Sequence, residues 1–463
     1  MRALGPATVP LATDATSNEA AASATPPVNP ELVRAKQVPQ ARKTGANVVE
    51  ILLFRGLSTP LALFLVVLQS RFLEAEGRGT FVLAVLTVSI FSRLLSQLGV
   101  AVANRMGHKE WDEPRELHAL TQRAFGLAVV LGVAGGVLIV GIGALTPSVG
   151  AATAAVAAVG LVPNVTWQTA SGVLLGLGRI RAWNYVQLAS PLLTVIGTLV
   201  LVVGLGGGVR AALAAWTCAH IVTALLALVL TRDIWQPFRF ARLLDSVSQG
   251  LIRLALTMGA LQVIALIGYR IELFVLEAIK GVAAVGVYSI ANQTAESIWL
   301  ISAAMATAIT APVVRADERE AVALVKRSLL RSLLYTGAAA GAVALAAPFV
   351  IPATLGGDFK NAATPLLLLL PGAVAYAPVQ VFVVYLSVRR GRAGLSLAAG
   401  GVAMLVTLAA AVPLVIAFGA AGAASASATG YACGALVAWA FFKRTTASPG
   451  LTAPAREGQT WLH

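Results

Sequence analysis

The stretch Tyr269–Trp299, YRIELFVLEAIKGVAAVGVYSIANQTAESIW, joins two long apolar segments through a short turn and carries charges within them. Arg270 and Glu272 lie near the end of the first segment, and Glu296 lies well inside the second. A charged side chain at the centre of a bilayer costs at least about 2.5 kcal/mol on insertion scales. We therefore expect these charges to face a paired or water-filled interior rather than lipid.

Composition places the chain among membrane proteins. It has 463 residues, of which 58% are hydrophobic and 12% charged, with a mean hydropathy of +0.82. Its apolar runs repeatedly reach the roughly 20 residues that span a bilayer. We predict an all-α polytopic membrane protein. Cys218 and Cys433 both lie in apolar runs, which favours neither a disulfide nor a metal site, and no cofactor is expected.

Twelve apolar segments are candidate membrane spans. They are 46–68, 80–102, 124–145, 150–177, 183–205, 209–230, 252–275, 286–314, 329–351, 362–387, 393–417 and 420–442. The domain organisation predicted from them is a disordered cytoplasmic tail at 1–45, a six-helix lobe at 46–230, a cytoplasmic linker at 231–251, a second six-helix lobe at 252–442 and a cytoplasmic tail at 443–463.

The distribution of cationic residues between loops predicts the orientation. One set of loops holds only Arg71, Arg78, Arg210, Lys280 and Lys360, whereas the alternate set is rich in arginine and lysine. Cytoplasmic loops carry the excess of positive charge, so the second set and both termini are predicted to be cytoplasmic. The same placement explains the net charge of +14 without nucleic-acid binding.

A weak internal repeat agrees with two lobes. GRGTFVLAVLTVSIFSRL from Gly77 can be laid on AVGVYSIANQTAESIWLI from Ala284, which places Gly79 over Gly286. Lobes of six spans each share one membrane orientation, as parallel repeats do.

Polar residues at helical spacing identify candidate site residues in the second predicted span. Ser89, Arg93 and Gln97 recur every four residues, which puts them on one helix face. The guanidinium of Arg93 matches phosphate oxygens in charge and geometry. An equally good interpretation is that Arg93 pairs with Glu296 and closes a gate.

Other spans contribute further candidates. Arg55 in the first span is a second candidate anion ligand. Arg270 is a third, although its position near a span end also allows its side chain to reach the interface. Asn292 and Glu296 share a helix face, and with Glu272 they are candidate polar cavity or gate residues.

Several motifs are absent from the sequence. There is no Walker A motif for an ATP-driven pump, no HExxH metal motif and no large loop rich in carboxylates. We therefore do not expect an enzyme.

GRGTFVLA after the first turn, YRIELFVL, AVGVYSIA and AESIW together resemble the polysaccharide transporter branch of the multidrug/oligosaccharidyl-lipid/polysaccharide (MOP) exporter superfamily. That branch includes O-antigen and teichoic-acid-type flippases, the former serving lipopolysaccharide biosynthesis. The resemblance implies two six-helix lobes around a central cavity that opens to alternate sides of the cell membrane. It also implies that arginines, here Arg55, Arg93 and Arg270, contact the diphosphate of an undecaprenyl-linked oligosaccharide.

The function expected is therefore a flippase for a lipid-linked oligosaccharide in the cytoplasmic membrane. Its expected partners are membrane lipids, a coupling proton or sodium ion, and polysaccharide-assembly enzymes. Two alternatives stay open: a cation-coupled multidrug or metabolite antiporter of the same superfamily, and a membrane scaffold that transports nothing.

Overall fold

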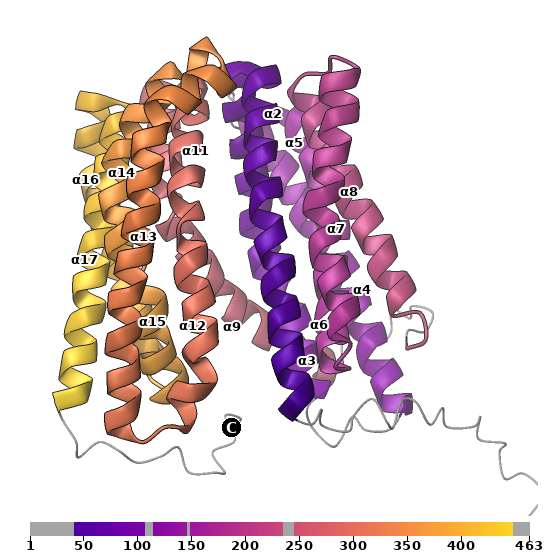
Figure 1. Ribbon diagram of the computed structural model, residues 1–463. Helices are drawn as coiled ribbons and strands as arrows, with labels where there is room; N and C mark the ends of the chain where they lie inside the picture. Colours follow the sequence, from indigo (N-terminus) through magenta and orange to yellow (C-terminus); the bar gives the residue numbers. More distant parts are fainter. Residues whose placement is uncertain (1–40, 107–113, 146–148, 235–244, 448–463) are drawn as a thin grey trace, which may run out of the picture. The chain divides into compact units, whose positions relative to one another are not determined.

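The computed structural model describes residues 41–106, 114–145, 149–234 and 245–447, and no β-strand occurs among them. The amino-terminal half consists of α2–α8 (Figure 1). Its elements are α2 (Ala41–Leu95), α3 (Gln97–Met106), α4 (Pro114–Leu145), α5 (Ala151–Val159), α6 (Leu161–Gly176), α7 (Ile180–Thr198), the π-helical η2 (Leu199–Gly204) and α8 (Val209–Leu230).

The carboxyl-terminal half consists of α9–α17. Its elements are α9 (Ser246–Gly268), α10 (Ile271–Lys280), α11 (Val282–Ser297), α12 (Trp299–Arg315), α13 (Glu318–Leu355), the 3-10 turn η4 (Gly357–Ala362), α14 (Ala363–Tyr376), α15 (Val379–Val383), the π-helical η5 (Val384–Arg389), α16 (Ala393–Phe418) and α17 (Ala420–Ala447).

The expectation of an all-helical membrane fold is confirmed. Ten helical segments of the described chain are long and apolar enough to cross a bilayer. One of them, Gly56–Met106, contains the second predicted span and residues 56–68 of the first. The predicted span 150–177 forms two helices that meet at Gly160. All twelve predicted ranges thus fall on helices, while the number of crossings and the orientation stay predictions.

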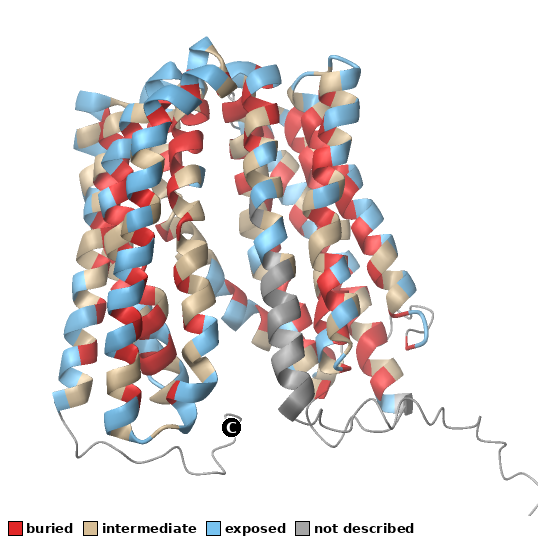
Figure 2. Ribbon diagram, viewed as in Figure 1, coloured by how far each residue is buried: buried red, intermediate tan, exposed pale blue. Residues whose placement is uncertain are grey.

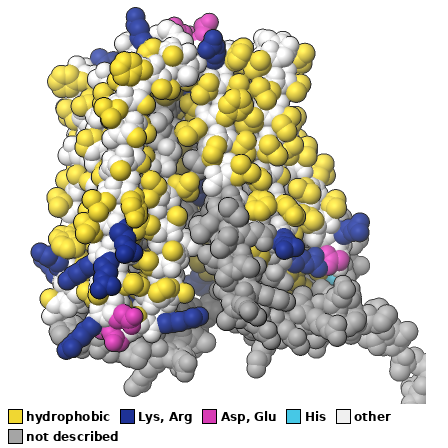
Figure 3. Space-filling model, in the orientation of Figure 1, with side chains coloured by type: hydrophobic (Ala, Val, Ile, Leu, Met, Phe, Trp, Pro, Cys, Tyr) yellow, Lys and Arg dark blue, Asp and Glu magenta, His cyan; other side chains and the backbone are white. Residues whose placement is uncertain are grey.

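Large apolar side chains on the outer surfaces of these helices agree with a lipid environment. Leu145, Leu345 and Phe349 are each at least 77% exposed. Helix faces alternate between buried and exposed positions (Figure 2), and the visible face is mostly hydrophobic between charged side chains at its two ends (Figure 3). The exposed apolar atoms are those that acyl chains would cover.

Several predicted boundaries differ from those observed. Helix α2 begins at Ala41, inside the predicted tail 1–45, and α9 begins at Ser246, inside the predicted linker 231–251. Helix α17 continues to Ala447, past the predicted start of the carboxyl-terminal tail. The predicted disorder of the tails otherwise concerns residues outside those described.

The first predicted outer loop is wrong in an important way. The turn expected between residues 68 and 80 is confined to Glu74, whose φ of 59° bends α2 while both flanking segments remain helical. A positive φ is uncommon for a non-glycine residue. Here it changes the direction of the chain at a single residue, without an intervening loop. As a result Arg78, predicted to lie in an outer loop, is part of a helix and is fully buried.

Helices α2 and α11 join the two halves through a close glycine contact. A Cβ atom on Gly286 would overlap the carbonyl oxygen of Ala75, and one on Gly79 would overlap that of Val282. Small residues allow helix backbones to approach this closely in membranes. Gly79 and Gly286, equivalent in the predicted repeat, therefore lie at the same helix–helix contact.

Helix α9 also contacts both halves. It packs against α2 and α3 as well as against α16. Its first turn is capped by Asp245, which accepts a hydrogen bond from the backbone nitrogen of Ser248 (2.8 Å) and pairs with Arg123 of α4 (2.6 Å). A carboxylate at an N-cap satisfies free helix N–H groups, so Asp245 fixes where α9 begins and ties it to α4.

Candidate functional site

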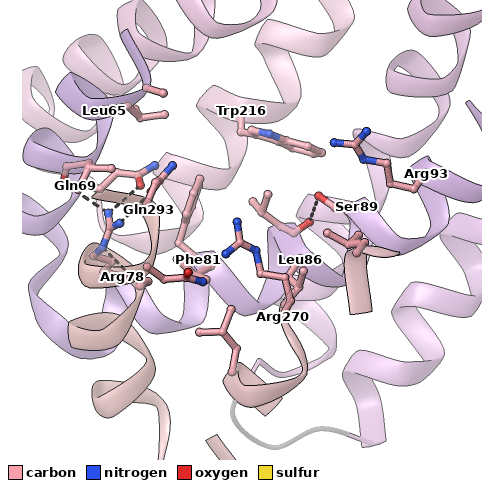
Figure 4. Close-up of a pocket in the computed structure, with 18 residues that line it drawn as sticks. Leu65, Gln69, Arg78, Phe81, Leu86, Ser89, Arg93, Trp216, Arg270 and Gln293 are labelled. Atoms are coloured by element: carbon pink, nitrogen blue, oxygen red, sulfur yellow. Dashed lines mark hydrogen bonds between the residues drawn. The ribbon is translucent and has the colours of Figure 1, made fainter. Parts of the chain in front are cut away.

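A cavity of about 350 Å³ lies between α2, α8, α9 and α11 and contains three arginines. We call it the arginine cavity. Its polar lining residues are Gln69, Arg78, Ser89, Arg93, Trp216, Arg270, Ser289, Asn292 and Gln293. Figure 4 shows the guanidinium groups of Arg78, Arg93 and Arg270 entering it from different sides.

Arg270 is placed by a break in the helix. Tyr269 and Arg270 lie between α9 and α10, and Arg270, with φ −135° and ψ 0°, is the residue directly before α10, so neither helix continues through it. Its Nη1 and Nη2 atoms donate to the two carboxylate oxygens of Glu296 on α11, at 2.8 and 2.6 Å. This bidentate geometry is the strongest that arginine makes with a carboxylate. Interface snorkelling is therefore not the role of Arg270, because its side chain turns inward to a partner.

Asn292 completes this pair one helical turn before Glu296. With its amide oriented to satisfy both neighbours, its nitrogen donates to Glu296 Oε1 (3.2 Å) and its oxygen accepts from Arg270. Asn292 is only 1% exposed and lines the arginine cavity. The predicted face of Asn292 and Glu296 thus forms a single hydrogen-bonded group with Arg270.

Arg78 was missed as a site residue by the sequence analysis. Its Nε donates to Ser289 Oγ (3.0 Å), Nη1 to Gln69 Oε1 (3.2 Å) and Nη2 to Gln293 Oε1 (3.4 Å). All of these acceptors are neutral, and no carboxylate of the described chain lies within ion-pair distance of Arg78. The signal that could have found it is the neighbouring Gly79, which lets a second helix approach the chain at this point.

Arg93 lies near the carboxyl end of α2 and points toward Trp216 across the cavity (Figure 4). The proposed pairing of Arg93 with Glu296 is not what the structure has, because Arg270 holds that carboxylate. Among the described residues no carboxylate forms an ion pair with Arg93. Its charge is therefore available to a ligand in the cavity.

The remaining candidates are distributed differently. Ser89 lines the cavity, and its hydroxyl donates to the Val85 carbonyl (2.7 Å). Gln97 begins α3 after a break at Ser96 and does not line this cavity in the described structure. Arg55 lies on α2, but its side chain falls outside the described residues.

Glu272 is fully buried behind the cavity rather than in its lining. The hydroxyl of Tyr288 donates to Glu272 Oε1 (3.2 Å), while the Oε2 atom has no hydrogen-bond partner in the described part of the chain. Glu272 lies two residues after Arg270 along the chain. Glu296, through its ion pair with Arg270, offsets part of the positive charge that the three arginines bring.

Comparison with known proteins decides the family. A family model for polysaccharide biosynthesis proteins matches residues 44–316, more than half of the chain. The chain belongs to this family. No curated protein matches the sequence.

Solved structures show which fold this polysaccharide biosynthesis protein shares. An inward-facing multidrug resistance MATE family transporter of the MOP superfamily matches with a TM-score of 0.69 at 17% identity, covering 84% of this chain and 94% of that one. The lipid II flippase MurJ, in an inward closed conformation, matches with a TM-score of 0.71 at 12% identity, covering 85% of this chain and 87% of that one.

A MOP superfamily transporter from Pyrococcus furiosus, described as having a binding pocket of reverse polarity, also matches. Its TM-score is 0.54 at 16% identity, with 87% of this chain and 95% of that one covered. The predicted resemblance to the polysaccharide transporter branch of the superfamily is confirmed by family and fold together. These findings support a multi-pass membrane transporter or flippase.

Proposed function

We propose that this protein is a flippase that moves an undecaprenyl-diphosphate-linked oligosaccharide across the cytoplasmic membrane by alternating access. The observation that carries the proposal is the convergence of Arg78, Arg93 and Arg270 on one cavity inside an apolar helical fold. Of these three arginines, only Arg270 has a carboxylate partner among the described residues. A diphosphate is the kind of cargo group that such a site would stabilise.

The three arginines have different roles in this proposal. Arg78 is held rigidly by neutral acceptors and supplies a fixed positive charge. Arg93 is the exposed arginine and makes first contact with the entering diphosphate. Arg270 exchanges Glu296 for a phosphate oxygen, so the ion pair is the form that the cavity adopts without cargo.

Glu296 is then the residue through which an ion gradient would act. When cargo takes Arg270, the released carboxylate needs a proton or sodium ion to remain in the membrane interior. Alternate binding of cargo to Arg270 and of a cation to Glu296 would couple the two movements.

The test is flipping of a diphosphate-linked oligosaccharide by purified protein in proteoliposomes. Arg93→Gln should lower the rate at least about tenfold, because a hydrogen bond to a charged group is worth about 1.5–3 kcal/mol. Arg331→Gln, which removes an exposed arginine of α13 outside the cavity, is the matched control and should flip at the wild-type rate.

Two outcomes would contradict the proposal. Equal rates for wild type and Arg93→Gln would remove the cavity arginine from the mechanism. Absence of flipping by the wild type, together with proton- or sodium-coupled movement of an organic cation, would establish the antiporter instead.

A further inference from the structure

A second and larger cavity, of about 810 Å³, lies within the carboxyl-terminal half. It is lined by α9, α12, α15, η5 and α16, and Tyr376 at the end of α14 contributes to its wall. Much of the α12 and α16 wall consists of small residues, including Ala303, Gly400 and Gly401, which leaves the space open. None of the three arginines of the arginine cavity lines it.

The polar groups that line this cavity are all neutral. They include Gln262, Tyr269, Thr307, Gln380 and Ser396, and no lining residue of the described chain is charged. The hydroxyl of Thr307 donates to the Ala303 carbonyl (2.8 Å). The side-chain amides of Gln262 and Gln380 have no hydrogen-bond partner among the described residues, so each offers a donor and an acceptor to a ligand.

A cluster of aromatic rings forms one wall. Tyr269 and Tyr376 meet edge to face with ring centroids 5.9 Å apart, and their hydroxyl groups are 3.0 Å apart. Behind them Trp299 lies 5.5 Å from Tyr376 and donates from its indole nitrogen to the Ala373 carbonyl (2.8 Å). Each ring has a fixed polar end and an apolar face, which makes the wall rigid and amphipathic.

These features select between classes of ligand. A phosphate or other ion would find no opposite charge in this lining. An acyl or isoprenyl chain would offer no hydrogen-bond partner to either glutamine amide, so its binding would make no use of the polar groups of this lining. A neutral polyhydroxyl ring offers both hydrogen-bonding groups for the amides and apolar C–H faces for the aromatic wall.

We propose that this cavity is a carbohydrate subsite, which receives sugar rings of the cargo whose diphosphate occupies the arginine cavity. The subsite rests on the proposed function. One helical turn connects the two cavities, because Leu266 and Arg270 line the arginine cavity while Ala265 and Tyr269 line the second. A helix with its side chains is about 10 Å across, a distance that a short run of linked sugars covers.

The test compares two kinds of probe on the full-length protein in lipid nanodiscs. One is undecaprenyl diphosphate without sugar, and the other is the same lipid carrying N-acetylglucosamine, glucose or galactose. Wild type should bind at least one sugar-bearing lipid more tightly than the sugar-free lipid. Gln380→Leu and Gln262→Leu should each lower the affinity for the sugar-bearing lipid about three- to tenfold and leave the affinity for the sugar-free lipid unchanged.

Unchanged binding of the sugar-free lipid also shows that each variant is folded. Gln187→Leu, on α7 outside both cavities, is the matched control and should leave both affinities at the wild-type value. Arg93→Gln should lower the affinity for both kinds of lipid, since it removes a contact to the diphosphate that both carry.

The outcomes separate the two proposals. If wild type binds every sugar-bearing lipid no better than the sugar-free one, the carbohydrate subsite is wrong while the diphosphate site stands. If the glutamine variants lower the affinity for the sugar-free lipid as much as that for the sugar-bearing lipid, the cavity holds the isoprenyl chain instead. Binding of none of the lipids would overturn the flippase proposal and the subsite together.

Discussion

Arg270 and Glu296 form a two-point ion pair in the interior of the helical bundle, with donor–acceptor distances of 2.8 and 2.6 Å. Arg270 lies at the break between α9 and α10, and Glu296 lies at the end of α11. Their side chains remain 25% and 18% exposed, and Arg270 lines the arginine cavity. The pair is therefore stable without cargo and still within reach of a competing anion.

Replacing the acidic partner tests this competition. Glu296→Gln should raise the affinity for undecaprenyl diphosphate about tenfold, because a neutral amide competes less well for Arg270 than a carboxylate does. The thermal unfolding midpoint should fall, since Arg270 loses its countercharge. Equilibrium binding and thermal unfolding of the purified protein measure the two effects. Glu277→Gln, on α10 beside a different cavity, is the control and should leave the affinity at the wild-type value. Unchanged affinity in Glu296→Gln would show that Arg270 does not contact the diphosphate.

Even a conservative substitution of Arg78 by lysine should reduce flipping. Arg78→Lys keeps the charge but cannot donate to Ser289, Gln69 and Gln293 together, so flipping should fall severalfold. Arg78→Gln should also lower the free energy of unfolding by about 1–3 kcal/mol, because buried acceptors lose their donor. Flipping assays and thermal unfolding provide the measurements. Ser289→Ala removes a single acceptor and should have a smaller effect; wild-type flipping by Arg78→Lys would exclude a role for this geometry.

The glycine contact between α2 and α11 should tolerate no side chain. Gly286→Ala places a methyl group against the carbonyl oxygen of Ala75, so the helices must separate at a cost of about 1–3 kcal/mol. Gly337→Ala is the matched control, because nothing lies within 4 Å of a Cβ atom there, and alanine should raise helix stability by about 0.5–1 kcal/mol. Thermal unfolding of both variants distinguishes them. Equal stability of the two variants would mean that the halves are not held by this contact.

The connection after α8 should have a pH-dependent stability. The hydrogen bonds from Arg179 lower the pKa of Asp233 below its ordinary value of 3.8. A carboxyl group whose pKa is lower in the folded state stabilises that state above its unfolded pKa, and this stabilisation is lost as the pH falls through the folded pKa. The gain should be below about 1 kcal/mol because the pair is partly exposed.

A double-mutant cycle of Arg179→Gln and Asp233→Asn, followed by thermal unfolding between about pH 3 and 7, measures this coupling. The coupling free energy should be constant near neutral pH and should decline below the ordinary pKa of the carboxyl group. A coupling that grows as the pH falls would contradict the assignment.

Apolar run lengths and intramembrane charges determined the class of fold. Because hydrocarbon leaves backbone groups no partner but one another, runs of this length must be helical, and all twelve predicted ranges are. The same rule led to Arg93, Arg270 and Glu296, since a charged side chain within an apolar run is costly unless it is paired or faces water. Local spacing also linked Asn292 to Glu296.

Partner choice was decided only in the tertiary structure. Spacing along one helix says nothing about which residue of another helix faces it, so the sequence analysis considered Arg93, and not Arg270, as the partner of Glu296. The break between α9 and α10 brought Arg270 to it. Arg78 was assigned to a loop because a reversal confined to Glu74 has no local signature, and only the contact of α2 with α11 encloses its side chain. Loop charge can be counted from the sequence, whereas burial depends on which helices meet.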